Sequence, residues 1–160
     1  MTSKLFSISC QSGNSTLASL LQHVAQTGHR LCTVSQSSTD IQDVILITLE
    51  LEIAGHAIDG FMEEILAIQG VQNATVSFGS VLHAATYHLK YEPHNFDLLQ
   101  TIRSHNTQII NISADKLLIL HVASEKDIRA LYNKLDTASL IGFSQMPVPI
   151  GEALFWNEMV

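Results

Sequence analysis

The chain has 160 residues, of which 46% are hydrophobic and 14% charged, and its formal net charge is −7. With only eight Lys and Arg residues, nucleic acid is not expected as a direct partner, because phosphate backbones are bound by clustered cations. No apolar run reaches the roughly 20 residues that cross a membrane, and the first residues hold too short an apolar stretch for a signal peptide. We therefore expect no membrane partner.

The first half of the chain predicts strand, helix, strand, strand, helix, strand. Its first helix carries apolar residues at positions i, i+3, i+4 and i+7, beginning at Leu17, which is the pattern of one buried helix face. Gly28 and Gly70 end the two helices. The expected elements are strands at 5–10, 30–35, 44–53 and 72–78, a helix through 17–24 and a helix through 58–65.

The second half repeats this order. Ser124 followed by Asp127 resembles a capping box at the start of its last helix, and Ala114 with Asp115 predicts a tight hairpin turn. The expected elements are strands at 82–91, 108–112, 117–122 and 139–144 and helices at 95–104 and 125–135.

Two βαββαβ units in tandem predict an α+β protein made of two ferredoxin-like domains, at residues 1–79 and 80–160, of the kind that binds small molecules between subunits. Halves of this size have an unfavourable ratio of surface to volume, so we expect a homodimer at least. The polar run 35–43 is expected to form an exposed hairpin tip. Pro147 and Pro149 are expected to break regular structure over residues 146–150. A tail such as 152–160 most often folds back on its own domain and less often docks on a partner.

No set of catalytic residues is evident, and we expect no enzyme activity. Cys10 and Cys32 lie on different predicted strands, which favours a reduced, cytoplasmic protein. The chain has eight histidines, but none has an HxxxH spacing and no CxxC is present. His83 and His88 are five residues apart on one strand and should face opposite ways. A metal-binding module is therefore the weakest interpretation, and no metal site is expected.

The turn between the first strand and the first helix is the place where binding is chemically favoured. Gly13 can adopt a positive φ, and the free N–H groups of residues 14–17 favour an anion such as an amino-acid carboxylate. A glycine turn that starts a helix is also a common structural device. The sequence alone leaves both interpretations open.

In order and proportions, the chain resembles the small regulatory subunit of acetolactate (acetohydroxyacid) synthase, which has an N-terminal ACT domain followed by an ACT-like domain. In the second half, LLQTIRSHNTQIINISADKLLILHVASEKDIRALYNKL follows the helix, strand, hairpin and last helix of that family. In the first half, CQSGNSTL is similar to the turn of the family and TGHRL is similar to its RGYNI motif. The segment LIGFSQMPVPIGEAL lies where the family usually reads TGxxALxRG, and only Gly151 and the hydrophobic rhythm agree with that ending.

In that family a branched-chain amino acid binds between two ACT domains, held by the turn and by two asparagines. The resemblance places Cys10 and Arg30 at the asparagine positions; cysteine is a poor hydrogen-bond partner, and a guanidinium cannot accept a hydrogen bond. Either the effector differs or feedback has been lost while assembly remains, and we expect weak or absent inhibition by valine. The expected effector site consists of Cys10, Gln11, Ser12, Gly13, Asn14, Arg30 and Leu31.

The resemblance implies a non-catalytic subunit that activates a catalytic large subunit of acetolactate synthase. That partner would hold thiamine diphosphate, Mg²⁺ and FAD and condense pyruvate with a second keto acid, while this chain would hold no cofactor. The alternative is a free-standing tandem ACT amino-acid sensor that regulates another target, as repressors of the glycine-cleavage type do.

Overall fold

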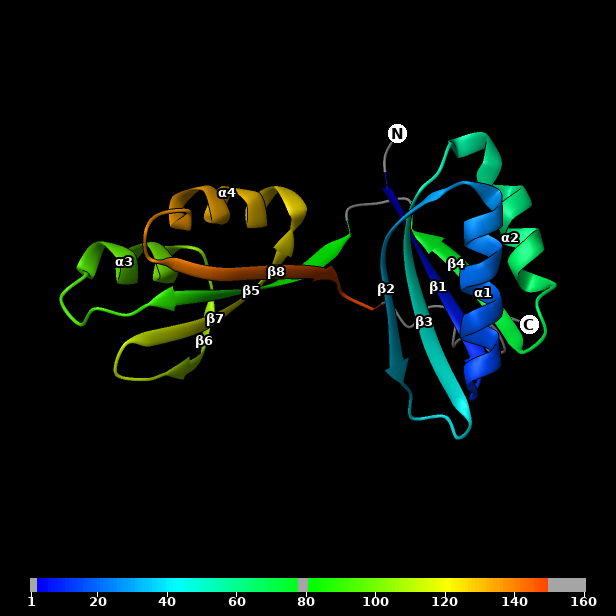
Figure 1. The fold of residues 1–160 in the computed structure, drawn as a ribbon, viewed down its shortest axis with the longest axis horizontal. Helices are drawn as coiled ribbons and strands as arrows, with labels where there is room; N and C mark the ends of the chain where they lie inside the picture. The colour runs from blue at the N-terminus through cyan, green and yellow to red at the C-terminus, as the bar shows by residue number, and fades with distance from the viewer. Residues whose placement is uncertain (1–2, 78–80, 150–160) are drawn as a thin grey trace. The chain divides into compact units, whose positions relative to one another are not determined.

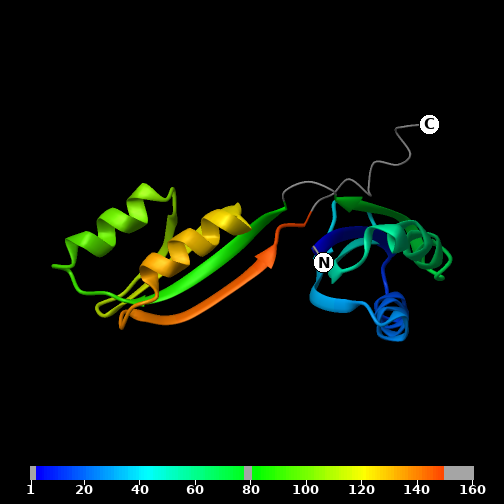
Figure 2. The same ribbon diagram turned by 90° about the horizontal axis from the view of Figure 1, so that it is seen from above.

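The computed structural model describes residues 3–77 and 81–149, which divide into two compact units. The first unit contains residues 3–77 and the second contains residues 81–148. Each is a four-stranded antiparallel sheet with two α-helices on one face (Figures 1 and 2). The expected α+β fold of two tandem βαββαβ domains is confirmed. The expected boundary after residue 79 falls between the two described ranges and stays a prediction.

The first unit has the sheet order β2-β3-β1-β4, so that β2 and β4 are its edge strands. The strand that was expected to end at residue 35 continues to Ser38, because residues 36–38 pair with β3. The connection between β2 and β3 is therefore shorter than the polar run suggested. The elements are β1 (Ser3–Gln11), α1 (Asn14–Thr27), β2 (Arg30–Ser38), β3 (Val44–Glu52), a short 3-10 helix (Gly55–Ala57), α2 (Ile58–Leu66) and β4 (Val71–Ser77).

The core of the first unit lies between the sheet and its two helices. Alternate residues of β1 face the helices, and β3 presents a matching apolar row. Phe6 meets Phe61 of α2 edge to face, with ring centroids 5.1 Å apart. Gly28 ends α1 in the left-handed conformation, with φ 75°, as its position after the apolar stripe predicted. This core fixes the end of β1 and the start of α1, and the candidate turn lies between them.

The second unit has the sheet order β6-β7-β5-β8. Its helices α3 and α4 cover one face of the sheet (Figure 2). Tyr87 of β5 is fully buried, and its hydroxyl donates to the backbone carbonyl of Ile128 at 3.1 Å. The elements are β5 (Leu82–Lys90), α3 (Phe96–Ser104), β6 (Gln108–Ile112), β7 (Lys116–Ser124), α4 (Glu125–Leu135) and β8 (Leu140–Pro147).

Local signals of the second half are borne out, with one exception. Ser124 Oγ accepts the Asp127 N–H at 3.2 Å as the N-cap of α4, and the 113–116 turn closes through a 2.9 Å backbone hydrogen bond. The expectation of a break at residues 146–150 was wrong for Met146 and Pro147, which belong to β8. Because β8 is an edge strand, it tolerates a proline that cannot donate a ladder hydrogen bond. Ile150 and the tail 152–160 lie outside the described residues.

His83 and His88 face opposite sides of the sheet, as their spacing predicted. His83 is buried, whereas His88 is exposed.

Within the described ranges, no helix is both long and apolar enough to cross a membrane.

Candidate effector site

The turn between β1 and α1 is held by two neighbouring loops. The Gln11 N–H donates to the Gly70 carbonyl at 2.8 Å, and the Ser12 N–H donates to the Asp43 carbonyl at 2.7 Å. The Thr16 hydroxyl, from the first turn of α1, donates to the Gln69 carbonyl at 3.4 Å. Two segments distant in sequence, at Asp43 and at Gln69–Gly70, therefore fix the start of α1.

Two glycine positions at this turn depend on the absence of a side chain. Gly13 has a φ of 152° and Gly70 a φ of 94°, both in the region that L side chains rarely adopt. At Gly70 a Cβ atom would also overlap the Thr16 hydroxyl, whereas at Gly13 it would meet nothing within 4 Å. Gly70 is therefore required for packing, and Gly13 leaves open space at the helix start.

The first turn of α1 lacks the usual acceptors for its N–H groups. Its N-cap is Gly13, no side chain among the described residues caps the helix, and its first turn contains no acidic residue. Unsatisfied amides at a helix N-terminus carry a partial positive charge and bind anions. The exposed turn at Gln11–Gly13 therefore presents a surface that is suited to a carboxylate. The side chain of Asn14, another residue of the expected effector site, lies outside the part of the chain that the structure describes.

Cys10 lies at the end of β1 with its side chain in the core, fully buried among the residues that face the helices. Burial raises the pKa of its thiol to about 11, so that the thiol stays neutral at physiological pH. Its sulfur is 3.8 Å from the carbonyl of Ile8. The side chain of Cys10 therefore does not face an effector at the turn, and Cys10 could contribute to an effector site only through the position of its backbone.

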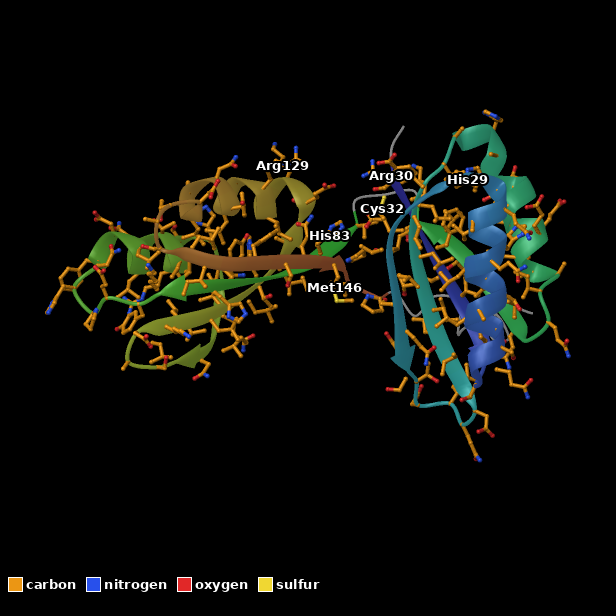
Figure 3. All side chains as sticks on the ribbon, in the orientation of Figure 1. His29, Arg30, Cys32, His83, Arg129 and Met146 are labelled. Atoms are coloured by element: carbon orange, nitrogen blue, oxygen red, sulfur yellow. The ribbon has the colours of Figure 1, made fainter. Side chains whose placement is uncertain are left out.

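Arg30 and Leu31 begin β2, at the opposite end of the sheet from the turn. Residue 30 is in register with Glu52, while Gln11 is in register with Val44 at the other end of β3. The guanidinium of Arg30 is 3.2 Å from a Glu52 carboxylate oxygen, and its side chain is 75% exposed. Figure 3 shows Arg30 at the end of the unit where α1 finishes. Within one copy of the chain, these residues do not meet the turn.

Sequence reasoning missed the residues that hold the turn. Asp43 is left-handed, with φ 58°, and supplies the acceptor for Ser12. Gly70 was interpreted only as the end of a helix, and Thr16 was given no role. An Asp immediately before a strand is a weak signal of a left-handed turn residue.

Among residues 3–77 and 81–149, no three His, Cys, Asp or Glu side chains gather in a way that could hold a metal ion. The two cysteines are free thiols, Cys10 being buried and Cys32 exposed. The arrangement at the turn can therefore bind through backbone donors, and it presents no nucleophile with a base.

No protein-family model and no curated protein matches this sequence. The crystal structure of the small subunit of acetolactate synthase from Thermotoga maritima superposes with a TM-score of 0.81 at 10% identity, covering 92% of this chain and 94% of that chain. The chain has the fold of that small subunit. The expected tandem ACT-type fold is thereby confirmed.

Two other solved structures are similar over comparable lengths with lower TM-scores. The regulatory subunit of aspartate kinase from Thermus thermophilus has a TM-score of 0.46 at 14% identity, covering 84% of this chain and 93% of that chain. A putative glycine cleavage system transcriptional repressor has a TM-score of 0.40 at 8% identity, covering 92% of this chain and 98% of that chain.

Proposed function

We propose that the protein is a non-catalytic regulatory subunit of acetolactate synthase, which activates a thiamine-dependent catalytic subunit. The observation that carries this proposal is the similarity to the Thermotoga maritima small subunit, which extends over nearly the whole of both chains. Thiamine diphosphate, Mg²⁺ and FAD would be held by the catalytic partner. The role of this chain would be to bind that partner and to change its activity in response to an amino acid.

A homodimer formed through β2 is part of the proposal. β2 is a nine-residue edge strand with no strand neighbour on its outer side among the described residues. An edge of that length presents a row of unpaired N–H and C=O groups, which favours pairing with another strand. Antiparallel pairing of β2 with its counterpart in a second copy would satisfy these groups and form one continuous sheet.

This pairing would also complete the effector site. The end of β2 at Ser38 is in register with Ile45, close to the end of the sheet that carries the turn. In an antiparallel pair, the start of one β2 lies beside the end of the other. Arg30 and Leu31 of one copy would therefore approach the turn of the second copy, and each site would draw on both chains.

The ligand of this composite site is an amino acid. Its carboxylate would bind to the first amides of α1, and Arg30 would face the opposite end of the ligand. Because Arg30 is exposed and pairs with Glu52 in a geometry that contributes little to stability, it is free to contact a ligand. A guanidinium donates hydrogen bonds and cannot accept them, so we expect valine to bind weakly.

Mixing the protein with the acetolactate synthase catalytic subunit of the same cell tests the function. We expect the rate of acetolactate formation from pyruvate to rise above that of the catalytic subunit alone, while the isolated chain forms none. The two proteins should also elute together in size-exclusion chromatography. Unchanged activity and separate elution would contradict the proposal and favour a free-standing amino-acid sensor.

The effector site is tested with two serines of α1. Ser15 and Ser19 are both exposed, but only Ser15 lies in the first turn. Ser15→Asp places a carboxylate where the effector carboxylate would bind, and it also favours the helix, whereas Ser19→Asp is the matched control. We expect the first variant to lose the amino-acid response and the second to keep it. Gly13 is less suitable for this test, since its φ of 152° strains any side chain.

A further inference from the structure

The second unit has a cavity between α4 and the edge strand β8, away from the strand β6 that corresponds to β2. Its volume is about 280 Å³, which is near the lower end of the range of small-molecule sites. One stripe of α4 and the helix-facing side of β8 form it. The lining residues are Glu125, Ile128, Arg129, Tyr132, Phe143 and Gln145.

Aromatic rings form the floor of this cavity. Phe143 meets Tyr132 edge to face at 4.8 Å between ring centroids, and it meets Tyr87 at 5.0 Å. Tyr87 is in turn fixed by the hydrogen bond from its hydroxyl to the Ile128 carbonyl. The floor is therefore apolar and held in place by the core, which suits the side chain of a ligand rather than its charged groups.

The rim of the cavity carries one cation, one anion and one amide. Arg129 and Glu125 are one turn apart on α4, and their charged atoms are 3.5 Å apart, with the side chains 73% and 53% exposed. Such an ion pair contributes little to stability, so it can separate at low cost. Figure 3 shows Arg129 on the solvent side of α4. Gln145, on β8, adds a group that both donates and accepts.

We propose that this cavity binds an L-α-amino acid with a large apolar side chain. The carboxylate of the ligand would pair with the Arg129 guanidinium and its ammonium with Glu125, while its side chain would pack on Tyr132 and Phe143. A guanidinium and a carboxylate beside an apolar floor match the three parts of such a zwitterion. This site is independent of the turn of the first unit, and it does not rest on the proposed synthase role.

Calorimetry on the full chain with L-leucine and two analogues tests the proposal. The analogues are 4-methylpentanoate, which lacks the ammonium group, and 3-methylbutylamine, which lacks the carboxylate. We expect leucine to bind at least about tenfold more tightly than either analogue. Glu125→Gln should lower the affinity for leucine, because it removes the partner of the ammonium group. It should not weaken 4-methylpentanoate, which has no ammonium group and whose carboxylate gains an Arg129 side chain freed from Glu125.

Arg129→Gln and Arg103→Gln form the matched pair of variants. Both arginines are exposed on helices of the second unit, so neither change should disturb the fold, as circular dichroism would verify. Arg129→Gln should weaken leucine binding at least about tenfold, and Arg103→Gln should not change it. Equal binding by wild type and Arg129→Gln, or no leucine binding by wild type at millimolar concentration, would overturn the proposal.

Ser15→Asp separates this site from the one at the turn. Leucine binding that survives Ser15→Asp but not Arg129→Gln belongs to the cavity of the second unit. Leucine binding that survives Arg129→Gln but not Ser15→Asp belongs to the turn, and it would overturn this inference while supporting the effector site. Each of the two proposals can thus fail without the other.

Discussion

The two central strands are nine residues long in both units, but the first unit encloses a larger apolar core, whereas the second unit has a smaller core that includes the phenol of Tyr87. Their edge strands differ as well, since β2 has nine residues and β6 has five. All five residues of β6 are exposed. Because apolar burial is the main stabilising term in folding, the same element order is held together unequally. The candidate turn lies in the unit with the larger core.

Core truncations should give the largest effects. Phe6 and Leu131 are fully buried, one in each unit. Phe6→Ala should cost about 3–5 kcal/mol and Leu131→Ala about 2–5 kcal/mol, because each removes buried apolar atoms and leaves a cavity. Urea denaturation measures these costs, and amide hydrogen exchange shows where protection is lost. We expect each variant to lose protection mainly in its own unit. An equal loss of protection in both units with either variant would show that the two units do not unfold separately.

The helix starts give a second contrast. α4 has a serine cap, whereas α1 begins after Gly13 and has no cap from the side chains that the structure describes. Ser124→Ala should destabilise the second unit by about 1 kcal/mol, because it removes the acceptor for the Asp127 N–H. Ser104→Ala is the control, since Ser104 is exposed at the end of α3 and caps no N-terminus. Thermal denaturation should distinguish the two variants, and equal midpoints would show that the cap contributes nothing.

Acid should affect the second unit through His121. This ring is buried, and its Nδ1 has no hydrogen-bond partner in the described part of the chain. Burial lowers the pKa of His121 below its ordinary value of 6.5; a repulsive contribution from His105 acts the same way, and Asp127 opposes both. The unfolded chain therefore binds the proton more tightly than the folded one. Stability should fall as the pH drops through 6.5, and it should level off below the lowered pKa.

His121→Asn should remove this part of the pH dependence, measured as unfolding free energy against pH. His88→Asn is the matched control, since His88 is exposed on the opposite face of the same sheet. An unchanged slope in His121→Asn would assign the acid sensitivity to other groups.

Much of the fold could be predicted from the sequence because period-two and period-3.6 patterns alternate clearly. The predicted bounds of α4 and β6 agree with the structure, and Ser124 is the N-cap of α4, as the sequence predicted. The ends of β2 and β8 were missed for a physical reason. Polar residues at 36–38 and a proline at 147 argue against a strand locally, but an edge strand accepts both.

The candidate site was less predictable, because it depends on where side chains and loops meet. Through a family resemblance, the sequence assigned Cys10 and Arg30 to one effector site, and this stays a prediction. Within one copy, the structure buries Cys10 and puts Arg30 at the far end of the sheet. The contacts of Thr16 with Gly70 and of Ser12 with Asp43 join segments far apart in the chain. No periodic pattern encodes such contacts.

A mixed dimer of two variants tests most directly whether the effector site is shared between two copies. Ser15→Asp damages the turn, and Arg30→Gln damages the start of β2 while costing at most about 1 kcal/mol of stability, because the pair with Glu52 is exposed. Both are made in the Arg129→Gln background, which weakens amino-acid binding to the cavity of the second unit. A mixed dimer contains one copy of each variant. If each site joins the turn of one copy to the β2 start of the other, one site of the mixed dimer carries both changes and the other site carries neither.

Calorimetry of the mixed dimer, purified through two different tags, decides the question with the proteinogenic amino acid that the Arg129→Gln parent binds most tightly. Each variant homodimer should bind this ligand weakly. The mixed dimer should recover tight binding at half the stoichiometry of the parent dimer. A mixed dimer that binds as weakly as both homodimers would contradict a site built from the turn of one copy and the β2 start of the other.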